Sequence, residues 1–166
     1  MTKAEELAAG FASDDPESRR RAVESLREPD LELEAPARYL LRALGDSDWL
    51  VRKQAVEVVR ALAPSADLLA GLVLVLEPGD NVGLRNAAVE ALGAFGEPAV
   101  EAILHKLPAL DSDGKKLAAE ALARTLLPSA LEVLRPLLAD ADSNVRAAAI
   151  DAIATVGASA ASDALE

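Results

Sequence analysis

Three short turns contain pairs of carboxylates that could bind a metal ion. In each turn two aspartates stand two residues apart: Asp46 and Asp48, Asp111 and Asp113, Asp140 and Asp142. The third turn supplies the first oxygen ligands of a calcium-binding loop, but Val145 stands where that loop needs glycine and Asp151 where it needs glutamate. Each pair also directly precedes a predicted helix, where an aspartate side chain caps free backbone N–H groups. We interpret all three pairs as helix caps and predict no metal site.

The rest of the sequence offers little for catalysis. His105 is the only histidine, and there is no cysteine. A lone imidazole cannot form a multi-histidine zinc or di-iron centre, and without thiols there is no disulfide, thiolate metal site or cysteine nucleophile. A glycine-rich phosphate loop and a Ser-His-Asp set are also missing. We predict that His105, which precedes Lys106 in a helical pattern, lies on the surface, and that the protein is not an enzyme and binds no cofactor.

A carboxylate recurs at one position of five similar segments. It follows a basic residue by five positions in each segment: Glu24, Glu57, Glu90, Glu120 and Asp151. If the segments are stacked helices, these acids form a stripe along the inner, concave surface. The stripe either binds a partner of basic character, or it is a solvated face whose acids pair with Arg20, Lys53 and Lys116 four residues earlier.

Under the first interpretation, the stripe and its neighbours form the candidate partner-binding surface: Glu24, Lys53, Glu57, Arg60, Asn86, Glu90, Lys116, Glu120 and Asp151. Trp49, the sole tryptophan, lies at a turn just before Val51 and Arg52. An exposed tryptophan would be a candidate anchor for a partner. Alternatively, Trp49 packs over the turn and covers the core, and the sequence leaves both interpretations open.

The five segments align on one basic residue: Arg19, Arg52, Arg85, Lys115 and Arg146. The intervals are 33, 33, 30 and 31 residues, a period typical of stacked-repeat proteins. Three residues after the basic position every segment has an alanine, and four residues later an aliphatic residue. This spacing puts both on one face of a helix. The sequence therefore predicts five amphipathic helices, and the recurrent alanine indicates that they pack closely.

A second set of helices is predicted before and between these five. The first covers roughly residues 3–12, and an acidic connection at 28–34 follows the next helix. We call the helices of this second set the leading helices, because each precedes one of the five. The other leading helices have a proline near their start: Pro36, Pro64, Pro98 and Pro128. Pro108 and Pro136 instead fall late in helical patterns, where proline removes a hydrogen bond and bends the axis.

The segments VRKQAVEVVRAL (51–62), LRNAAVEALGAFG (84–96) and VRAAAIDAIATVG (145–157) resemble the second helix of HEAT repeats, of the bacterial type also called lyase-like HEAT repeats. The resemblance covers nearly the whole chain. It implies an all-α fold, a right-handed α-α superhelix (α-solenoid) of about five helical pairs, with residues 1–166 forming one domain.

In that family an aspartate in the turn and the following arginine form a hydrogen-bond ladder between neighbouring repeats. Asp46 with Arg52 and Asp140 with Arg146 fit this pattern. Arg85 occupies the same basic position, but the residue six before it is Gly79. The first and fourth segments have Ser13 and Ala109 there, so we expect the ladder to be incomplete.

Composition narrows the possible partners. Hydrophobic residues make up 51% of the chain and aromatic residues 2%, which suits stacked helices better than a β-sandwich or barrel. The formal net charge of −11 opposes binding to nucleic acid or an anionic membrane.

The longest apolar run, Leu68 to Leu76, is shorter than the roughly 20 residues that span a bilayer, and we expect it to be a fully buried helix. The N-terminus does not resemble a signal peptide, so a cytoplasmic protein is expected.

The last residues, ASAASDALE, begin another leading helix whose apolar set is cut short. A terminal repeat normally needs a polar cap. We therefore expect either a fragment of a longer protein or a rudimentary cap.

These observations predict a non-catalytic protein–protein interaction scaffold that presents a concave groove of second helices to a protein or peptide. A monomer is favoured, and the sequence does not identify the partner. Two alternatives follow from the resemblance: a subunit of a bilin (phycobiliprotein) lyase, and a HEAT-like DNA glycosylase. The glycosylase would need a basic concave face with aromatic residues, which the acidic stripe opposes.

Overall fold

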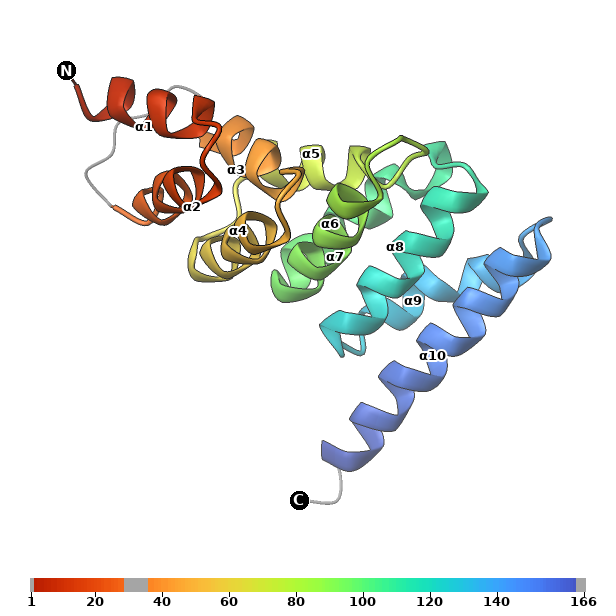
Figure 1. Ribbon diagram of the computed structural model, residues 1–166. Coiled ribbons are helices and arrows are strands. Elements are labelled where there is room, and N and C mark those ends of the chain that lie inside the picture. Colours follow the sequence, from red (N-terminus) through yellow and green to blue (C-terminus); the bar gives the residue numbers. More distant parts are fainter. Residues whose placement is uncertain (1, 29–35, 164–166) are drawn as a thin grey trace.

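The chain folds into pairs of helices, and the second helix of each pair contains one of the repeated segments. The computed structural model describes residues 2–28 and 36–163, so the connection at 29–35 and residues 164–166 lie outside it. The described part contains α-helices, two short 3-10 helices and no strand (Figure 1). The elements are α1 (Lys3–Ala12), α2 (Pro16–Ser25), α3 (Pro36–Leu44), α4 (Trp49–Ala61), α5 (Ala66–Leu74), α6 (Val82–Ala94), α7 (Glu97–Lys106), η1 (Leu107–Ala109), α8 (Ser112–Thr125), α9 (Ala130–Leu134), η2 (Arg135–Ala139) and α10 (Ser143–Asp163).

Consecutive helices form five pairs, and the pairs stack. The second helices α2, α4, α6, α8 and α10 contact one another in that order, and the first helices α3, α5, α7 and α9 do the same. The stack curves along its length, with the C-terminal pairs turned relative to the N-terminal pairs (Figure 1). The fold is an α-solenoid, and the predicted five pairs are confirmed for the described residues.

Helix boundaries lie where side chains cap the backbone. Asp48 accepts hydrogen bonds from the N–H groups of Leu50 and Val51, and Asp111 accepts one from Gly114. Asp142 accepts one from Asn144. The second aspartate of the 46–48 and 140–142 pairs and the first of the 111–113 pair therefore cap helices, as predicted.

The prolines act at two kinds of position. Pro36 and Pro98 lie in the first turns of α3 and α7. Pro108 and Pro136 lie in the 3-10 helices that follow α7 and α9. Because proline cannot donate the next α-helical hydrogen bond, the predicted bends occur as a change to 3-10 geometry.

The core is built from the two periodic positions of the second helices. All five alanines are buried: Ala22, Ala55, Ala88, Ala118 and Ala149. The aliphatic residues four positions later are buried in the first four pairs, and Ile153 is only partly buried. No polar side chain is fully buried in the described part. The expectation of a fully buried helix at 68–76 was wrong, because Leu74 and Ala70 face solvent from α5.

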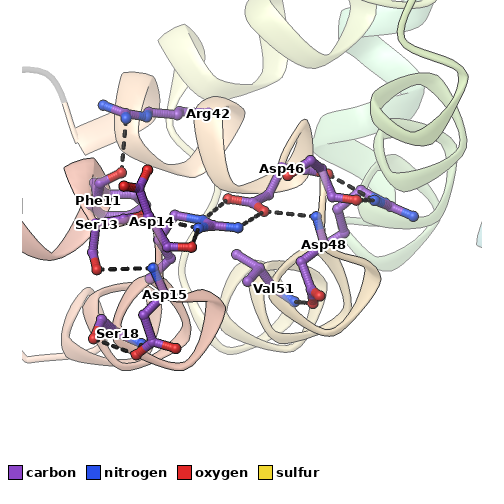
Figure 2. Close-up of polar contacts among 12 residues, drawn as sticks. Phe11, Ser13, Asp14, Asp15, Ser18, Arg42, Asp46, Asp48 and Val51 are labelled. Atoms are coloured by element: carbon purple, nitrogen blue, oxygen red, sulfur yellow. Dashed lines mark hydrogen bonds and ion pairs between the residues drawn. The ribbon is translucent and has the colours of Figure 1, made fainter.

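A hydrogen-bond ladder joins the first two pairs at their turns (Figure 2). Nε and Nη2 of Arg19 donate to the two carboxylate oxygens of Asp46 at 2.8 and 2.9 Å. Nη1 of Arg52 donates to the backbone carbonyls of Asp46 and Ser47 at 2.7 and 3.0 Å. Asp46 and Arg52 thus meet, as predicted, but the carboxylate pairs with the arginine of the preceding pair.

The last two pairs repeat this arrangement. Nζ of Lys115 donates to the Asp140 carboxylate at 2.7 Å, and Nη1 of Arg146 donates to the carbonyls of Asp140 and Ala141. The pKa of Asp140 lies below its ordinary value because of the Lys115 hydrogen bond and the Asp142 N–H. Arg19 and Lys115 are therefore ladder residues that the sequence analysis had not assigned.

The two middle junctions lack this ladder. At the second, Gly79 stands at the acid position, and the Asn81 side chain donates instead to the Gly45 carbonyl at 2.8 Å. At the third, the turn is one residue shorter, so the buried Leu110 directly precedes the cap Asp111. Among the described residues, Nε of Arg85 is buried without a hydrogen-bond partner, and its Nη2 reaches only the Leu76 carbonyl of its own pair at 3.3 Å. The ladder is thus incomplete, as expected.

Candidate partner-binding face

A hollow lies where the second helices α4, α6 and α8 meet. Its volume is about 650 Å³, and we call it the central hollow. Buried Val56 and Ala87 contribute apolar surface, while charged and polar side chains surround them. The lining residues are Trp49, Arg52, Lys53, Val56, Glu57, Gly83, Asn86, Ala87, Glu90, Glu120 and Arg124.

Two further hollows adjoin it. One, of about 520 Å³, lies between α2 and α4 and shares Glu57 with the central hollow; its lining is Arg20, Arg21, Glu24, Arg27, Gln54 and Glu57. The other, of about 540 Å³, shares Glu90, Glu120 and Arg124; its lining is Arg60, Glu90, Gly93, Ala94, Glu120, Ala123, Arg124, Leu126 and Thr155. The three hollows form one surface along the second helices, which we call the concave face.

Ion pairs cross the concave face. Arg60 pairs with Glu57 in its own helix at 3.6 Å and with Glu90 of the next pair at 2.7 Å. Glu120 pairs with Arg124 at 2.9 Å. The central hollow is lined by three cations and three carboxylates, so its charge is balanced rather than acidic.

The local pairs predicted for a solvated face do not form. Arg20 pairs with Glu17 at 3.0 Å, and Lys116 pairs with Asp113 at 2.6 Å. The Asp113 hydrogen bond raises the pKa of Lys116. Glu24 instead pairs with Arg27 and accepts a hydrogen bond from Gln54 of the next pair. Four acids of the stripe are therefore paired with residues that follow them or lie in a neighbouring pair: Glu24, Glu57, Glu90 and Glu120.

Trp49 lies at the rim of the central hollow. Its residue surface is 58% exposed, so it does not serve as a cover for the core. The Nζ atom of Lys53 lies 5.9 Å from the centre of the Trp49 ring, within the range of a cation–π contact. The indole is thus held against a cation while more than half of the residue surface faces solvent.

The structure brings together most of the predicted site residues. Lys53, Glu57, Asn86, Glu90 and Glu120 line the central hollow. Arg60 and Glu24 line the two adjoining hollows. Lys116 and Asp151 line none of the three.

Arg124 and Leu126 line the concave face but were not predicted from the sequence. Arg124 recurs in two hollows, but the repeat pattern gave no signal because the equivalent positions in the other segments are not basic. Leu126 follows α8 with a φ of 56°, a left-handed conformation that disfavours non-glycine residues, and its side chain is exposed. Nothing in the sequence indicates that conformation, since glycine is the usual residue there.

The described residues contain no cluster of three or more His, Cys, Asp or Glu side chains with the geometry of a metal site. His105 is exposed at the end of α7, as predicted. No helix in the part of the chain that the structure describes has the length and apolar character needed to cross a membrane.

Two stretches of the sequence match family models for one kind of helical repeat. Residues 100–166 match a model described as HEAT repeats, and residues 38–66 match a model described as HEAT repeat. The chain is a HEAT-repeat protein. The match to residues 38–66 contains α4 and most of α3, and the match to residues 100–166 contains most of α7 and the elements from η1 to α10.

Three crystal structures, each titled as an engineered protein, are similar to this HEAT-repeat protein. Their sequence identities are 22%, 21% and 23%, with TM-scores of 0.41, 0.40 and 0.42. The matches cover 92%, 90% and 93% of this chain, and 78%, 79% and 48% of the engineered chains. Among curated proteins none matches the sequence.

Proposed function

We propose that this HEAT-repeat protein is a non-catalytic scaffold that binds a segment of another protein on its concave face. The observation that carries the proposal is the central hollow, which spans three consecutive second helices and continues into two neighbouring hollows. A surface that extends over several consecutive second helices suits an extended or helical segment better than a small molecule.

The side chains of the central hollow support this proposal. Asn86 is exposed, and its amide has no hydrogen-bond partner in the described part of the chain, so it can both donate to and accept from a partner's main chain. Trp49 adds an exposed aromatic surface at the rim, the residue type that most often anchors interfaces. Together they offer one polar and one apolar contact point within the same hollow.

The charges suggest a partner segment that carries both signs. The carboxylates of the central hollow are balanced by Arg52, Lys53 and Arg124. A basic partner residue would therefore compete with Arg60 or Arg124 for an existing carboxylate, which gives selectivity but little net affinity. One aromatic ring and three carboxylates in the lining give no support to the nucleic-acid alternative, and neither the two family models nor the three engineered structures named above are described as a lyase.

The proposal is tested by placing a photo-crosslinking amino acid at Asn86 and, as a control, at the exposed Leu104 of α7. After irradiation in a lysate of the source organism, mass spectrometry identifies the attached proteins. We expect one or a few proteins to be attached from Asn86 and not from Leu104. Equal labelling from both positions would count against a binding role for the concave face.

A charge-matched comparison then locates the contact. Changing Glu57, Glu90 and Glu120 to Lys should remove the adducts formed from Asn86. The control changes three exposed acids of the first helices, Asp67, Glu101 and Glu132, to Lys and has the same net charge. If both triple variants lose the adducts equally, overall charge rather than the concave face controls binding.

A further inference from the structure

One large apolar side chain of α10 is exposed at a position that is buried in every earlier second helix. The position lies four residues after the basic residue of each segment. Its occupants in the first four pairs are Val23, Val56, Val89 and Ala119, exposed by 0%, 3%, 2% and 0%. The equivalent residue in α10 is Ile150, which is 58% exposed.

The position seven residues after the basic residue shows the same difference. Leu26, Val59, Leu92 and Leu122 are buried, whereas Ile153 is only partly buried. In each of the first four pairs the second helix is packed against by the second helix of the next pair. No helix in the described residues packs on that side of α10. Ile150 and Ile153 therefore occupy positions that are buried between repeats elsewhere, but no helix of the described residues covers them.

Gly157 provides a separate indication of a missing neighbour. Four other helical glycines lie where an added Cβ would come within 3.0 Å of a neighbouring helix: Gly10 against Ala22, Gly71 against Leu41, Gly83 against Arg52, and Gly93 against Arg124. An added Cβ on Gly157 would meet nothing within 4 Å. Glycine inside a helix costs about 0.5–1 kcal/mol relative to alanine, and no contact in the described part of the chain accounts for it here.

These residues share one face of the helix. Ile150, Ala154, Gly157 and Ala161 follow one another at spacings of four, three and four residues, and all are exposed. We call them the open face of α10. A large side chain beside a glycine and two alanines matches the ridge and groove that a second helix needs for close packing.

The distribution of charge favours a second copy of this chain as the source of the helix that covers the open face. The chain carries a net charge of −11, so two copies repel each other wherever their carboxylates meet. From Ala152 to Ser162, α10 has no charged residue. Two copies that meet on this stretch bring no like charges together, and a two-fold axis lets the same face serve both partners.

We propose that the protein forms a dimer in which the open face of α10 packs against the open face of a second copy. The sequence analysis favoured a monomer, and the exposure of Ile150 cannot be read from its repeat position. The proposal is independent of the proposed function, since Thr155 is the only α10 residue that lines the concave face.

Sedimentation of the purified chain over about 1 to 200 µM tests this proposal, a range that detects dissociation constants up to about 100 µM. We expect a concentration-dependent change from 17.3 kDa to twice that mass. Ile150→Glu places a charge in the interface, and Gly157→Leu fills the space that the second helix needs. Each should raise the dissociation constant of the dimer at least about tenfold. Thr155→Glu puts the same charge on the concave side of the same helix and should leave dimerisation unchanged.

Circular dichroism shows whether each variant keeps its helices, so that loss of the dimer is not confused with unfolding. A wild-type chain that stays monomeric over the whole range would overturn the proposal and leave the open face to a helix of another protein. Dimers of unchanged strength in both Ile150→Glu and Gly157→Leu would place the interface elsewhere. Equal weakening by Ile150→Glu and Thr155→Glu would show a general charge effect, which also overturns it.

Discussion

The carboxylate of Asp46 accepts three hydrogen bonds, and two of them connect the first two helix pairs. It accepts two from Arg19 and one from the N–H of Asp48. The side chains of Arg19 and Asp46 are only 12% and 10% exposed, so solvent screens this ion pair less than those on the concave face. Burial acts to raise the pKa of Asp46, but the hydrogen bonds from Arg19 and Asp48 outweigh it. The pKa of Asp46 therefore lies below its ordinary value of 3.8.

Asp46→Asn removes the charge and keeps the size of the side chain. We expect it to lower the free energy of unfolding by about 1.5–3 kcal/mol at pH 7, the range for hydrogen bonds to charged groups. Because the folded pKa of Asp46 is depressed, its contribution is complete above pH 3.8 and is lost as the pH falls through the folded value. The difference between wild type and variant should therefore shrink in acid. Urea unfolding from pH 7 down to about pH 2 measures it.

The matched control is Glu17→Gln, which removes an exposed carboxylate that pairs with Arg20. It should leave the urea midpoint at pH 7 unchanged, because exposed pairs contribute little. If Asp46→Asn has no larger effect than this control, the ladder does not stabilise the fold.

The helices differ in how closely a neighbouring helix packs against their glycines. Gly93 of α6 lies so close to α8 that an added Cβ would come within 2.5 Å of the Arg124 Cβ, whereas the space beside Gly157 of α10 is open. The same substitution should therefore have opposite effects in the two helices.

Gly157→Ala should raise the free energy of unfolding by about 0.5–1 kcal/mol, because alanine loses less backbone entropy in a helix. Gly93→Ala should lower it, because α6 and α8 must move apart. Thermal unfolding is measured at protein concentrations too low for a dimer to form. A lower melting temperature for Gly157→Ala would show that α10 packs more closely than the structure indicates.

The sequence predicted elements better than contacts. Helix caps such as Asp48 and bends at Pro108 depend on the local chain, so periodicity and residue type were sufficient. The ion pairs of Glu90 and Glu120 depend on residues of other turns or other repeats, and the predicted local pairs were wrong. The ladder is absent at the third junction, as expected from Ala109, and the structure adds that the shortened turn puts Leu110 in the place of the ladder acid. The interval of 30 residues shows in the sequence that this repeat is shorter, but only the structure places the shortening in this turn.

At the scale of the whole molecule, charge is unevenly distributed. The chain carries −11, yet the central hollow is lined by equal numbers of cations and carboxylates. The excess of carboxylates therefore lies elsewhere. Self-repulsion of that excess destabilises the compact state.

Salt should consequently stabilise the protein. Raising the salt concentration from about 10 to 150 mM shortens the screening length from roughly 30 to 8 Å, which weakens the long-range repulsion more than the short ion pairs. We expect the melting temperature to rise with NaCl concentration when thermal unfolding is measured at a series of concentrations. A fall would mean that the ion pairs of the concave face and the ladder contribute more than the net charge costs.

The uneven ladder has a consequence for the shape of the molecule. The first and last junctions are fixed by directional hydrogen bonds to Asp46 and Asp140, and among the described residues no such bond or ion pair links α5 and α6 to α7 and α8. Apolar packing resists separation of helices but has no preferred direction for small sliding movements. Bending of the superhelix should therefore concentrate at the third junction, over which the α6 and α8 side of the central hollow lies. The two ends would then move as stiff arms, and the curvature between them would adjust to the width of whatever segment they enclose.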